Sequence, residues 1–240
     1  MNYLSFGSSK NVIVFLHGWG ADKNSFLWIK NYFDDYTTIF IDFYGHGDSV
    51  DAKASYCLDD FVYGVKNILD KFEIDKLVIV GHSFGGRVAI KYASYFQNKY
   101  KCFKLCLVDS AGIKPKHGLK YYCSVLRFKI YKKLAQKNNR YKNKLCSFGS
   151  LDYKNLSDDM KPVFVRIVNE DLSLYASGIK LETLIVWGSE DKDTKPYMAK
   201  RLNKLIKNSQ LCFIKNAGHF SFLDNREEFV FLLDRFLKNL

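Results

Sequence analysis

Short apolar runs, separated by longer stretches of mixed polarity, recur along the whole chain. The runs are rich in Val, Ile, Leu and Phe and show little polar alternation, as expected for strands of a parallel sheet that is covered on both faces. They fall at 11–16, 37–42, 76–80, 103–109, 181–187 and 210–214. Most of the intervening stretches carry apolar residues at three- and four-residue steps, which is typical of amphipathic helices. These helices are expected at 24–34, 58–72, 84–97, 195–207 and 225–239.

Strand and helix alternate almost throughout, which predicts an α/β fold with a doubly wound, mostly parallel sheet and right-handed crossovers. The alternation breaks once, across 113–177, where no strand pattern is present. We therefore expect residues 1–112 and 178–240 to form the core, with residues 113–177 inserted as a helical cap. The chain has only three prolines and no Gly/Ser-rich linker, so the insertion should pack against the core.

Positive charge is concentrated in the predicted insertion. The chain has a formal net charge of +12, and eleven of its 37 basic residues, but no Asp or Glu, lie between Lys114 and Cys146. Apolar residues in the same segment recur at helical steps and predict an amphipathic helix with a basic outer face. Such a face either keeps the surface solvated or attracts an anionic substrate, an acidic carrier protein or an anionic membrane. No nucleic-acid-binding motif accompanies the charge, and we expect no nucleic-acid partner.

Several classes of protein are excluded by pattern and composition. The longest apolar runs, such as 12–16 and 229–233, have five residues, whereas a membrane-spanning helix needs about 20. The first residues lack the pattern of an export signal, so a cytoplasmic location is expected. The six cysteines form no C-x-x-C pair and no Cys/His metal spacing, which favours reduced thiols, with no metal site and no cofactor.

The clearest chemical signal is the sequence Gly-His-Ser-Phe-Gly at 81–85, directly after the predicted strand 76–80 and at the start of the helix 84–97. This is the context that a G-x-S-x-G nucleophile elbow requires. Its glycines flank a serine that must adopt a strained conformation in a tight turn, which lifts the hydroxyl out of the sheet. We predict Ser83 as a nucleophile, and a serine that merely caps the helix is the structural alternative.

A serine nucleophile needs a base, and the base needs an acid that orients it. His219 is the predicted base, because it is the one histidine that follows the last predicted strand. His82 is expected to be a neighbour of the site, since adjacent strand residues point to opposite faces. For the acid, Asp191 follows the strand 181–187 and gives the chain order Ser, Asp, His.

Three other carboxylates remain open as the acid. Asp109 ends the predicted strand 103–109, and Glu190 and Asp193 neighbour Asp191 in the sequence. We prefer Asp191 because its position after the penultimate strand matches the chain order expected for this kind of triad.

Acyl transfer also requires N–H donors for the negative oxygen of the tetrahedral intermediate. One is predicted at the backbone amide of Phe84, directly after the nucleophile at the helix start. The other is predicted at the amide of Trp19, in the glycine-rich turn 17–20 after the first predicted strand. We expect Trp19, His82 and Phe220 to line the substrate pocket.

In their order along the chain, these motifs resemble those of the α/β-hydrolase superfamily. The matching segments are His-Gly-Trp-Gly at 17–20, Asp-x-x-Gly-x-Gly-x-Ser at 42–49, Gly-His-Ser-Phe-Gly-Gly at 81–86, Trp-Gly-Ser-Glu-Asp at 187–191 and Ala-Gly-His-Phe at 217–220. The resemblance covers about 1–112 and 178–240 and implies an α/β-hydrolase fold with 113–177 as the variable cap. Members commonly begin with an antiparallel hairpin, but few residues precede the strand 11–16, so we expect a trimmed sheet edge.

The resemblance also narrows the reaction. Dehalogenase and epoxide-hydrolase members carry aspartate at the elbow, and Ser83 argues against both. The resemblance implies an enzyme that hydrolyses a small-molecule carboxylic ester or thioester through an acyl-enzyme, without a cofactor. A carbon–carbon hydrolase of the meta-cleavage type and a hydrolase-fold binding protein or receptor are the alternatives. The basic segment would suit an anionic or carrier-linked substrate, and its Tyr, Phe and Leu residues would suit an acyl or aromatic pocket.

Overall fold

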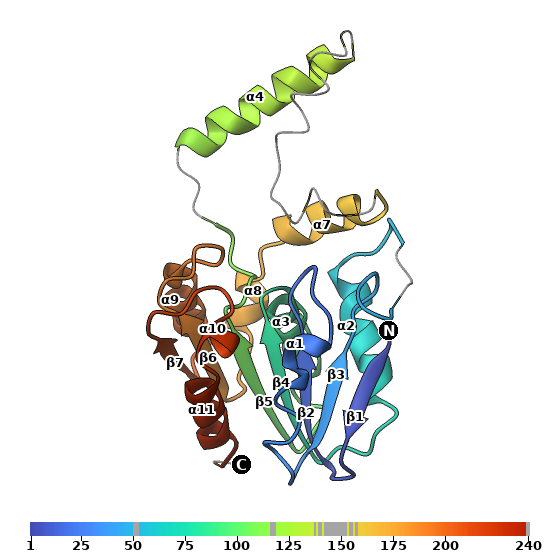
Figure 1. The fold of residues 1–240 in the computed structure, drawn as a ribbon, viewed down its shortest axis with the longest axis vertical. Helices are drawn as coiled ribbons and strands as arrows, with labels where there is room; N and C mark the ends of the chain where they lie inside the picture. The colour runs from blue at the N-terminus through green and yellow to red at the C-terminus, as the bar shows by residue number, and fades with distance from the viewer. Residues whose placement is uncertain are drawn as a thin grey trace.

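Seven strands form one sheet in the computed structural model, which describes residues 1–49, 53–115, 119–136, 138, 141, 153, 156 and 158–238 (Figure 1). The strands are β1 (Tyr3–Phe6), β2 (Asn11–Leu16), β3 (Thr37–Ile41), β4 (Lys76–His82), β5 (Cys102–Val108), β6 (Thr183–Gly188) and β7 (Ser209–Ile214). Their order across the sheet is β1-β3-β2-β4-β5-β6-β7. Neighbours run parallel, except that β1 pairs with β3 in the antiparallel direction. The predicted mostly parallel sheet is confirmed.

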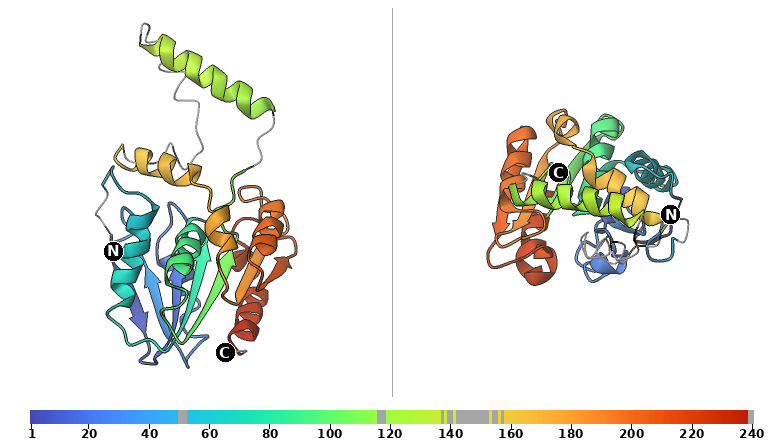
Figure 2. Two further views of the ribbon diagram at one scale, coloured as in Figure 1. Left: turned by 180° about the vertical axis from the view of Figure 1, so that it is seen from behind. Right: turned by 90° about the horizontal axis from the view of Figure 1, so that it is seen from above.

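Helices cover both faces of this sheet (Figures 1 and 2). One face packs against α2 (Leu58–Leu69), α3 (Phe84–Phe96), α8 (Ser173–Ser177) and α9 (Pro196–Leu205). The other face packs against α1 (Asn24–Leu27), α10 (Ser221–Asp224) and α11 (Arg226–Lys238). Successive residues of a strand therefore enter different cores: Val14 packs on one side, and Ile13 and Phe15 pack on the other. This double covering explains why the central strands are apolar without alternation.

The antiparallel edge strand β1 is not predicted by the sequence pattern. It has only four residues, of which two are half-buried and two exposed, so its apolar pattern is too short to stand out. Its pairing with β3, in which Tyr3 lies opposite Ile41, is what makes it a strand. The expected trimming of the sheet edge is therefore incomplete, because one antiparallel strand remains.

The predicted helix 24–34 is also only partly formed. After the single turn of α1, the chain continues in turns with three-residue hydrogen bonds, such as the bond from the Ile29 amide to the Phe26 carbonyl. These turns still bury Phe26, Ile29 and Phe33 on one side of the segment. Spacing of apolar residues at three- and four-residue steps is satisfied by such turns, so the pattern alone overestimated the helix.

The predicted insertion 113–177 contributes α4 (Leu119–Ala135) and α7 (Met160–Asn169), which lie beyond the carboxyl ends of the parallel strands (Figure 1). Near the end of this range, α8 instead packs beside α3 in the helical layer, where Leu172 and Ala176 are fully buried. The limits of the cap remain a prediction. Among the helices that the structure describes, none combines the length and apolar character needed to cross a membrane.

Candidate active site

Ser83 lies in a strained turn between β4 and α3. Its backbone has φ 49° and ψ −108°, a conformation that is costly for a residue with a Cβ atom. The backbone packs closely on both sides: a Cβ on Gly85 would lie 2.2 Å from the Leu16 carbonyl oxygen, and one on Gly81 would lie 2.6 Å from the Gly85 carbonyl oxygen. Both positions therefore require glycine, as the elbow pattern predicts.

Three loops bring Ser83, His219 and Asp191 into one chain of hydrogen bonds. The Oγ of Ser83 lies 3.0 Å from Nε2 of His219, and Nδ1 of His219 lies 2.9 Å from Oδ2 of Asp191. Asp191 is buried and is held by Thr194, whose hydroxyl donates to Oδ2 at 2.6 Å and whose amide donates to Oδ1 at 3.0 Å. With Nδ1 donating to the carboxylate, Nε2 of a neutral imidazole is free to accept the serine proton.

The surroundings of Asp191 and His219 shift their pKa values in opposite directions. Burial by itself would raise the pKa of Asp191, but hydrogen bonds from His219 and Thr194 outweigh it and hold this pKa below its ordinary value. Burial by itself would lower the pKa of His219, but the hydrogen bond and charge of Asp191 raise it, with smaller contributions from Asp109 and Asp193. The pair is therefore arranged to stabilise an imidazolium beside a carboxylate.

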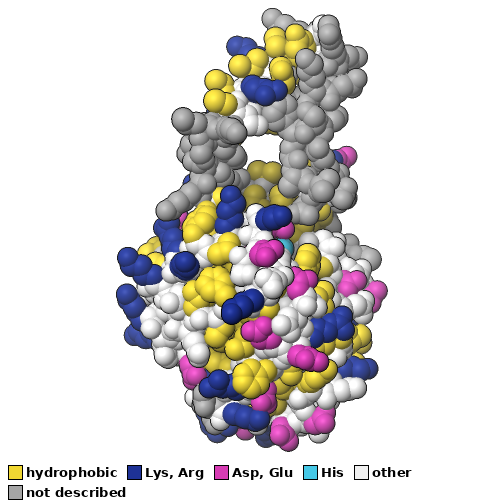
Figure 3. Space-filling view, turned by 60° about the vertical axis from the view of Figure 1, so that its left-hand side comes forward, with side chains coloured by type: hydrophobic (Ala, Val, Ile, Leu, Met, Phe, Trp, Pro, Cys, Tyr) yellow, Lys and Arg dark blue, Asp and Glu magenta, His cyan; other side chains and the backbone are white. Residues whose placement is uncertain are grey.

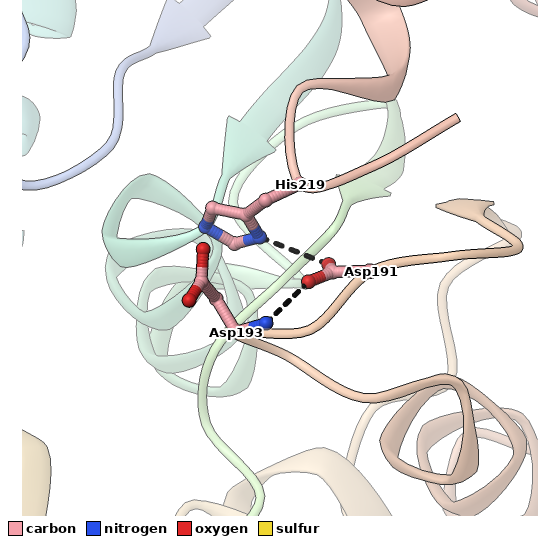
Figure 4. A group of neighbouring side chains, drawn as sticks. All are labelled: Asp191, Asp193 and His219. Atoms are coloured by element: carbon pink, nitrogen blue, oxygen red, sulfur yellow. Dashed lines mark hydrogen bonds and ion pairs between the residues drawn. The ribbon is translucent and has the colours of Figure 1, made fainter. Parts of the chain in front are cut away.

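Asp193 lies on the open side of this pair, with its carboxylate beside the imidazole ring of His219 (Figure 4). Its amide donates to Oδ1 of Asp191 at 2.8 Å. Oxygen and nitrogen atoms of Asp191, Asp193 and His219 lie within 4.8 Å of one another, a spacing that could suit a divalent cation. Because Asp191 and His219 already bind each other, we assign the group to the acid–base pair.

Asp109, the main alternative acid, serves a different purpose. It is buried at the end of β5, where Oδ1 accepts from the Gly188 amide at 2.7 Å. Its Oδ2 accepts from the Ser221 amide at 3.0 Å and from the Ser221 hydroxyl at 2.6 Å. Burial raises the pKa of Asp109 to about 7, against these hydrogen bonds. Asp109 thus ties together the loops that carry Asp191 and His219.

Two buried histidines hold backbone atoms around the site. His82 donates from Nε2 to the His219 carbonyl oxygen at 2.8 Å, and burial lowers its pKa to about 3, which keeps it neutral. His17 donates from Nδ1 to the Gly18 carbonyl oxygen at 2.7 Å and accepts from the Phe43 amide at 3.1 Å, with its pKa lowered to about 4 by burial. His82 therefore holds the backbone of His219.

A cavity of about 500 Å³ opens directly above Ser83 and His219. Trp19 and Phe84 line it next to the nucleophile, and their rings meet edge to face at 4.9 Å between centroids. A Cβ on Gly18 would lie 3.4 Å from Cβ of Ser83, so the turn that carries Trp19 lies against the nucleophile.

Further walls of the cavity come from the predicted insertion, from the loop after β7 and from the segment 193–198 after β6. Phe164 of α7 stacks edge to face on Trp19 at 5.2 Å between ring centroids. Phe220, next to His219, is 47 % exposed and is open to a ligand, whereas His82 is only 2 % exposed. The expected pocket residues thus share one cavity, with Phe220 the more accessible of these last two.

Sequence reasoning missed several residues of this site. Thr194 and Ser221 lie three residues after Asp191 and two after His219, but short hydroxyl side chains in loops carry no distinctive pattern. Arg87 was also missed, although it lies one helical turn after Ser83. It is buried against the cavity and donates to the carbonyl oxygens of Glu170 and Val168 at 2.8 and 3.1 Å, so it anchors the end of α7 to α3. Burial lowers its pKa to about 10.

Comparison with known proteins agrees with this architecture. An AB hydrolase superfamily protein from Bacillus subtilis, YisY, is 24% identical over 243 residues, which cover 93% of this chain and 90% of that protein. An esterase from Exiguobacterium antarcticum superposes with a TM-score of 0.74 at 24% identity, covering 98% of this chain and 94% of the other.

A further solved structure, of a meta-cleavage product hydrolase from Pseudomonas fluorescens, superposes with a TM-score of 0.72 at 20% identity, covering 99% and 94% of the two chains. At these identities the structural likeness shows the fold. The model of one protein family, described as the alpha/beta hydrolase fold, matches residues 11–122 and 123–226. Together with the sheet order and the elbow, this match identifies the chain as a member of the α/β-hydrolase family, and as a hydrolase enzyme.

Proposed function

We propose that this enzyme cleaves a small-molecule carboxylic ester or thioester, with Ser83 as nucleophile, His219 as base and Asp191 as the acid. The observation that carries the proposal is the continuous chain of hydrogen bonds, 3.0 Å and 2.9 Å long, from the serine hydroxyl to the buried carboxylate. His219 accepts the proton of Ser83 as its Oγ attacks the acyl carbon. It then donates that proton to the leaving group, and later activates the water that releases the acid.

The tetrahedral intermediate needs donors aimed at its negative oxygen. We assign these to the backbone amides of Trp19 and Phe84, which flank the nucleophile on the β2 turn and at the start of α3. The position of Gly18 against Ser83 supports the first assignment, and the helix N-terminus supports the second.

The acyl group is proposed to bind in the cavity of about 500 Å³. Its walls of Trp19, Phe84, Phe164 and Phe220 suit an apolar or aromatic group. His82 borders this space and orients the backbone of His219. The segment 113–177 acts as the cap in this proposal. A cytoplasmic location agrees with a cysteine pattern that favours reduced thiols.

Labelling with a fluorophosphonate probe tests the nucleophile, and a panel of nitrophenyl esters and acyl thioesters of graded length tests the substrate class. We expect labelling at Ser83, its loss in Ser83→Ala, and turnover of at least one ester or thioester series. Labelling elsewhere, or turnover that survives Ser83→Ala, would contradict the proposal.

Carbon–carbon hydrolysis is the second candidate, favoured by the fold shared with the meta-cleavage product hydrolase. It would use the same three residues. Turnover of a vinylogous diketone without turnover of any nitrophenyl ester would select it over ester hydrolysis.

A further inference from the structure

One side of α4 carries apolar residues that the described part of the chain leaves uncovered. Leu126, Ile130 and Leu134 follow one another at four-residue steps and form a single stripe, which we call the α4 stripe. Their exposed fractions are 59%, 48% and 37%. A helix presents one face to its own protein, and large aliphatic residues exposed in a row on another face indicate a contact surface.

Other apolar residues of α4 are covered to different degrees. Val125 and Tyr131 are half-buried and Ala135 is buried, whereas Phe128 is 37% exposed. Exposed residues therefore surround most of α4, and the α4 stripe is its most exposed row of apolar side chains. The basic surface that the sequence predicts for this helix thus includes an apolar stripe.

Basic residues border the α4 stripe on both sides. Arg127 lies along one edge, and Lys129 and Lys133 lie along the other; all three are exposed. Figure 3 shows hydrophobic and basic side chains together on α4, at the upper end of the view. The sequence between 113 and 151 contains no Asp or Glu to compensate them. The surface is therefore apolar in the centre and positively charged at the edges.

This combination fits an anionic lipid surface better than a protein partner. Aliphatic side chains at helical spacing enter the boundary between head groups and acyl chains, while flanking Lys and Arg reach the phosphates. A second copy of the chain would oppose one set of basic residues to another, which is unfavourable. An acidic protein could match the charge but would leave the row of aliphatic residues unexplained.

We infer that α4 docks the enzyme on an anionic membrane surface and that its substrate is a lipid-like ester resident there. The substrate part rests on the proposed ester hydrolysis, whereas the docking part does not. α4 lies beyond the carboxyl ends of the strands, at the end of the molecule where Ser83 follows β4 (Figure 1). Docking through α4 turns this end of the enzyme toward the bilayer.

Co-sedimentation with vesicles tests the docking directly, using the full chain with Ser83→Ala so that lipid turnover plays no part. We expect binding to vesicles of mixed phosphatidylglycerol and phosphatidylcholine, weakening at high salt, and little binding to phosphatidylcholine alone. Lys129→Gln with Lys133→Gln should weaken binding about tenfold or more. The matched control, Lys200→Gln with Lys207→Gln, removes the same charge from exposed positions outside α4 and should have a smaller effect.

The pair Leu126→Ser and Ile130→Ser tests the apolar part of the surface. It should weaken vesicle binding while leaving the melting temperature unchanged, because both side chains are exposed. Equal effects of the α4 lysine pair and the control pair, or no binding to anionic vesicles, would overturn the inference. Binding that depends on the lysines but not on Leu126 and Ile130 would overturn the role of the α4 stripe, because it would show attachment to the lipid by charge alone. Failure of ester hydrolysis would appear separately, in the labelling and ester panel.

Discussion

At the scale of single residues, the fold holds Ser83 and Asp191 in place in two different ways. Ser83 is presented by a strained backbone that its glycine neighbours make possible, and the buried carboxylate of Asp191 accepts three hydrogen bonds from Asp193 and Thr194 of its own loop. Between them, His219 is only 14% exposed and binds both. Each of the three residues is therefore placed by its own loop.

Substitution of the three residues should separate their roles. Ser83→Ala and His219→Ala are each expected to lower kcat/KM on a soluble ester by about 10⁴-fold or more, because either change removes the proton transfer from the nucleophile. Asp191→Asn should leave measurable residual activity. If Asp191→Asn were silent and Asp109→Asn crippling, Asp109 would be the acid instead.

The pH dependence of kcat/KM should report the ionisation of His219. Only the neutral imidazole can accept the serine proton, so activity should rise with pH as His219 loses its proton. Because the pKa of His219 is raised, the midpoint of this rise is expected above the ordinary value of 6.5. A midpoint below that value, measured in the free enzyme at low substrate, would contradict the charge environment described here.

Substitution of Asp193 tests which nearby charge raises the midpoint of this pH profile. Its negative charge beside the imidazole favours the protonated form, so Asp193→Asn should move the midpoint to lower pH. The matched control is Glu190→Gln, which removes an exposed carboxylate from the same loop. The control should shift the midpoint less; equal shifts would mean that the net charge of the surface, and not the place of Asp193, sets the pKa of His219.

At the scale of structural elements, Asp109 links the ends of β5 and β6 with the loop after β7. Its side chain accepts hydrogen bonds from the amides of Gly188 and Ser221, and its backbone carbonyl oxygen lies 3.0 Å from Oγ1 of Thr194, whose proton is shared with Asp191. Asp109 itself has φ 43°, so its own backbone is strained to reach these partners. Asp109, a second buried carboxylate, thus links the loops that carry Asp191 and His219.

Asp109→Asn should consequently impair catalysis without touching the reacting atoms. In the asparagine variant, an NH₂ group replaces one of the two oxygens and faces the N–H of Gly188 or of Ser221, which then lacks an acceptor. A buried donor without an acceptor costs about 1–3 kcal/mol. We expect kcat to fall about tenfold or more with a smaller change in KM, because the base is displaced while the pocket remains. The acidic midpoint of the pH profile should move as well. Unchanged kcat and midpoint, together with a lower melting temperature, would show a purely structural role.

At the scale of the whole molecule, the order of the sheet explains why three distant segments meet. Ser83, Asp191 and His219 each follow a parallel strand, and the carboxyl ends of β4, β6 and β7 lie along one edge of the sheet. The sequence predicts that these residues meet, because each of the three strands is a distinct apolar run whose carboxyl end can be located. It also predicts the elbow, since a serine between glycines at a strand-to-helix junction needs only local information.

The sequence by itself determined six of the seven strands, most of the helices, the elbow and the candidate nucleophile and base, because these follow from apolar periodicity and short-range backbone geometry. Only the tertiary structure decided that Asp191, and not Asp109, contacts His219, since both follow buried strands and differ only in which loop each carboxylate faces. It alone revealed β1, whose four residues become a strand by pairing with β3, and the exposure of the α4 stripe. Contacts between residues far apart in the chain leave no periodic trace in the sequence.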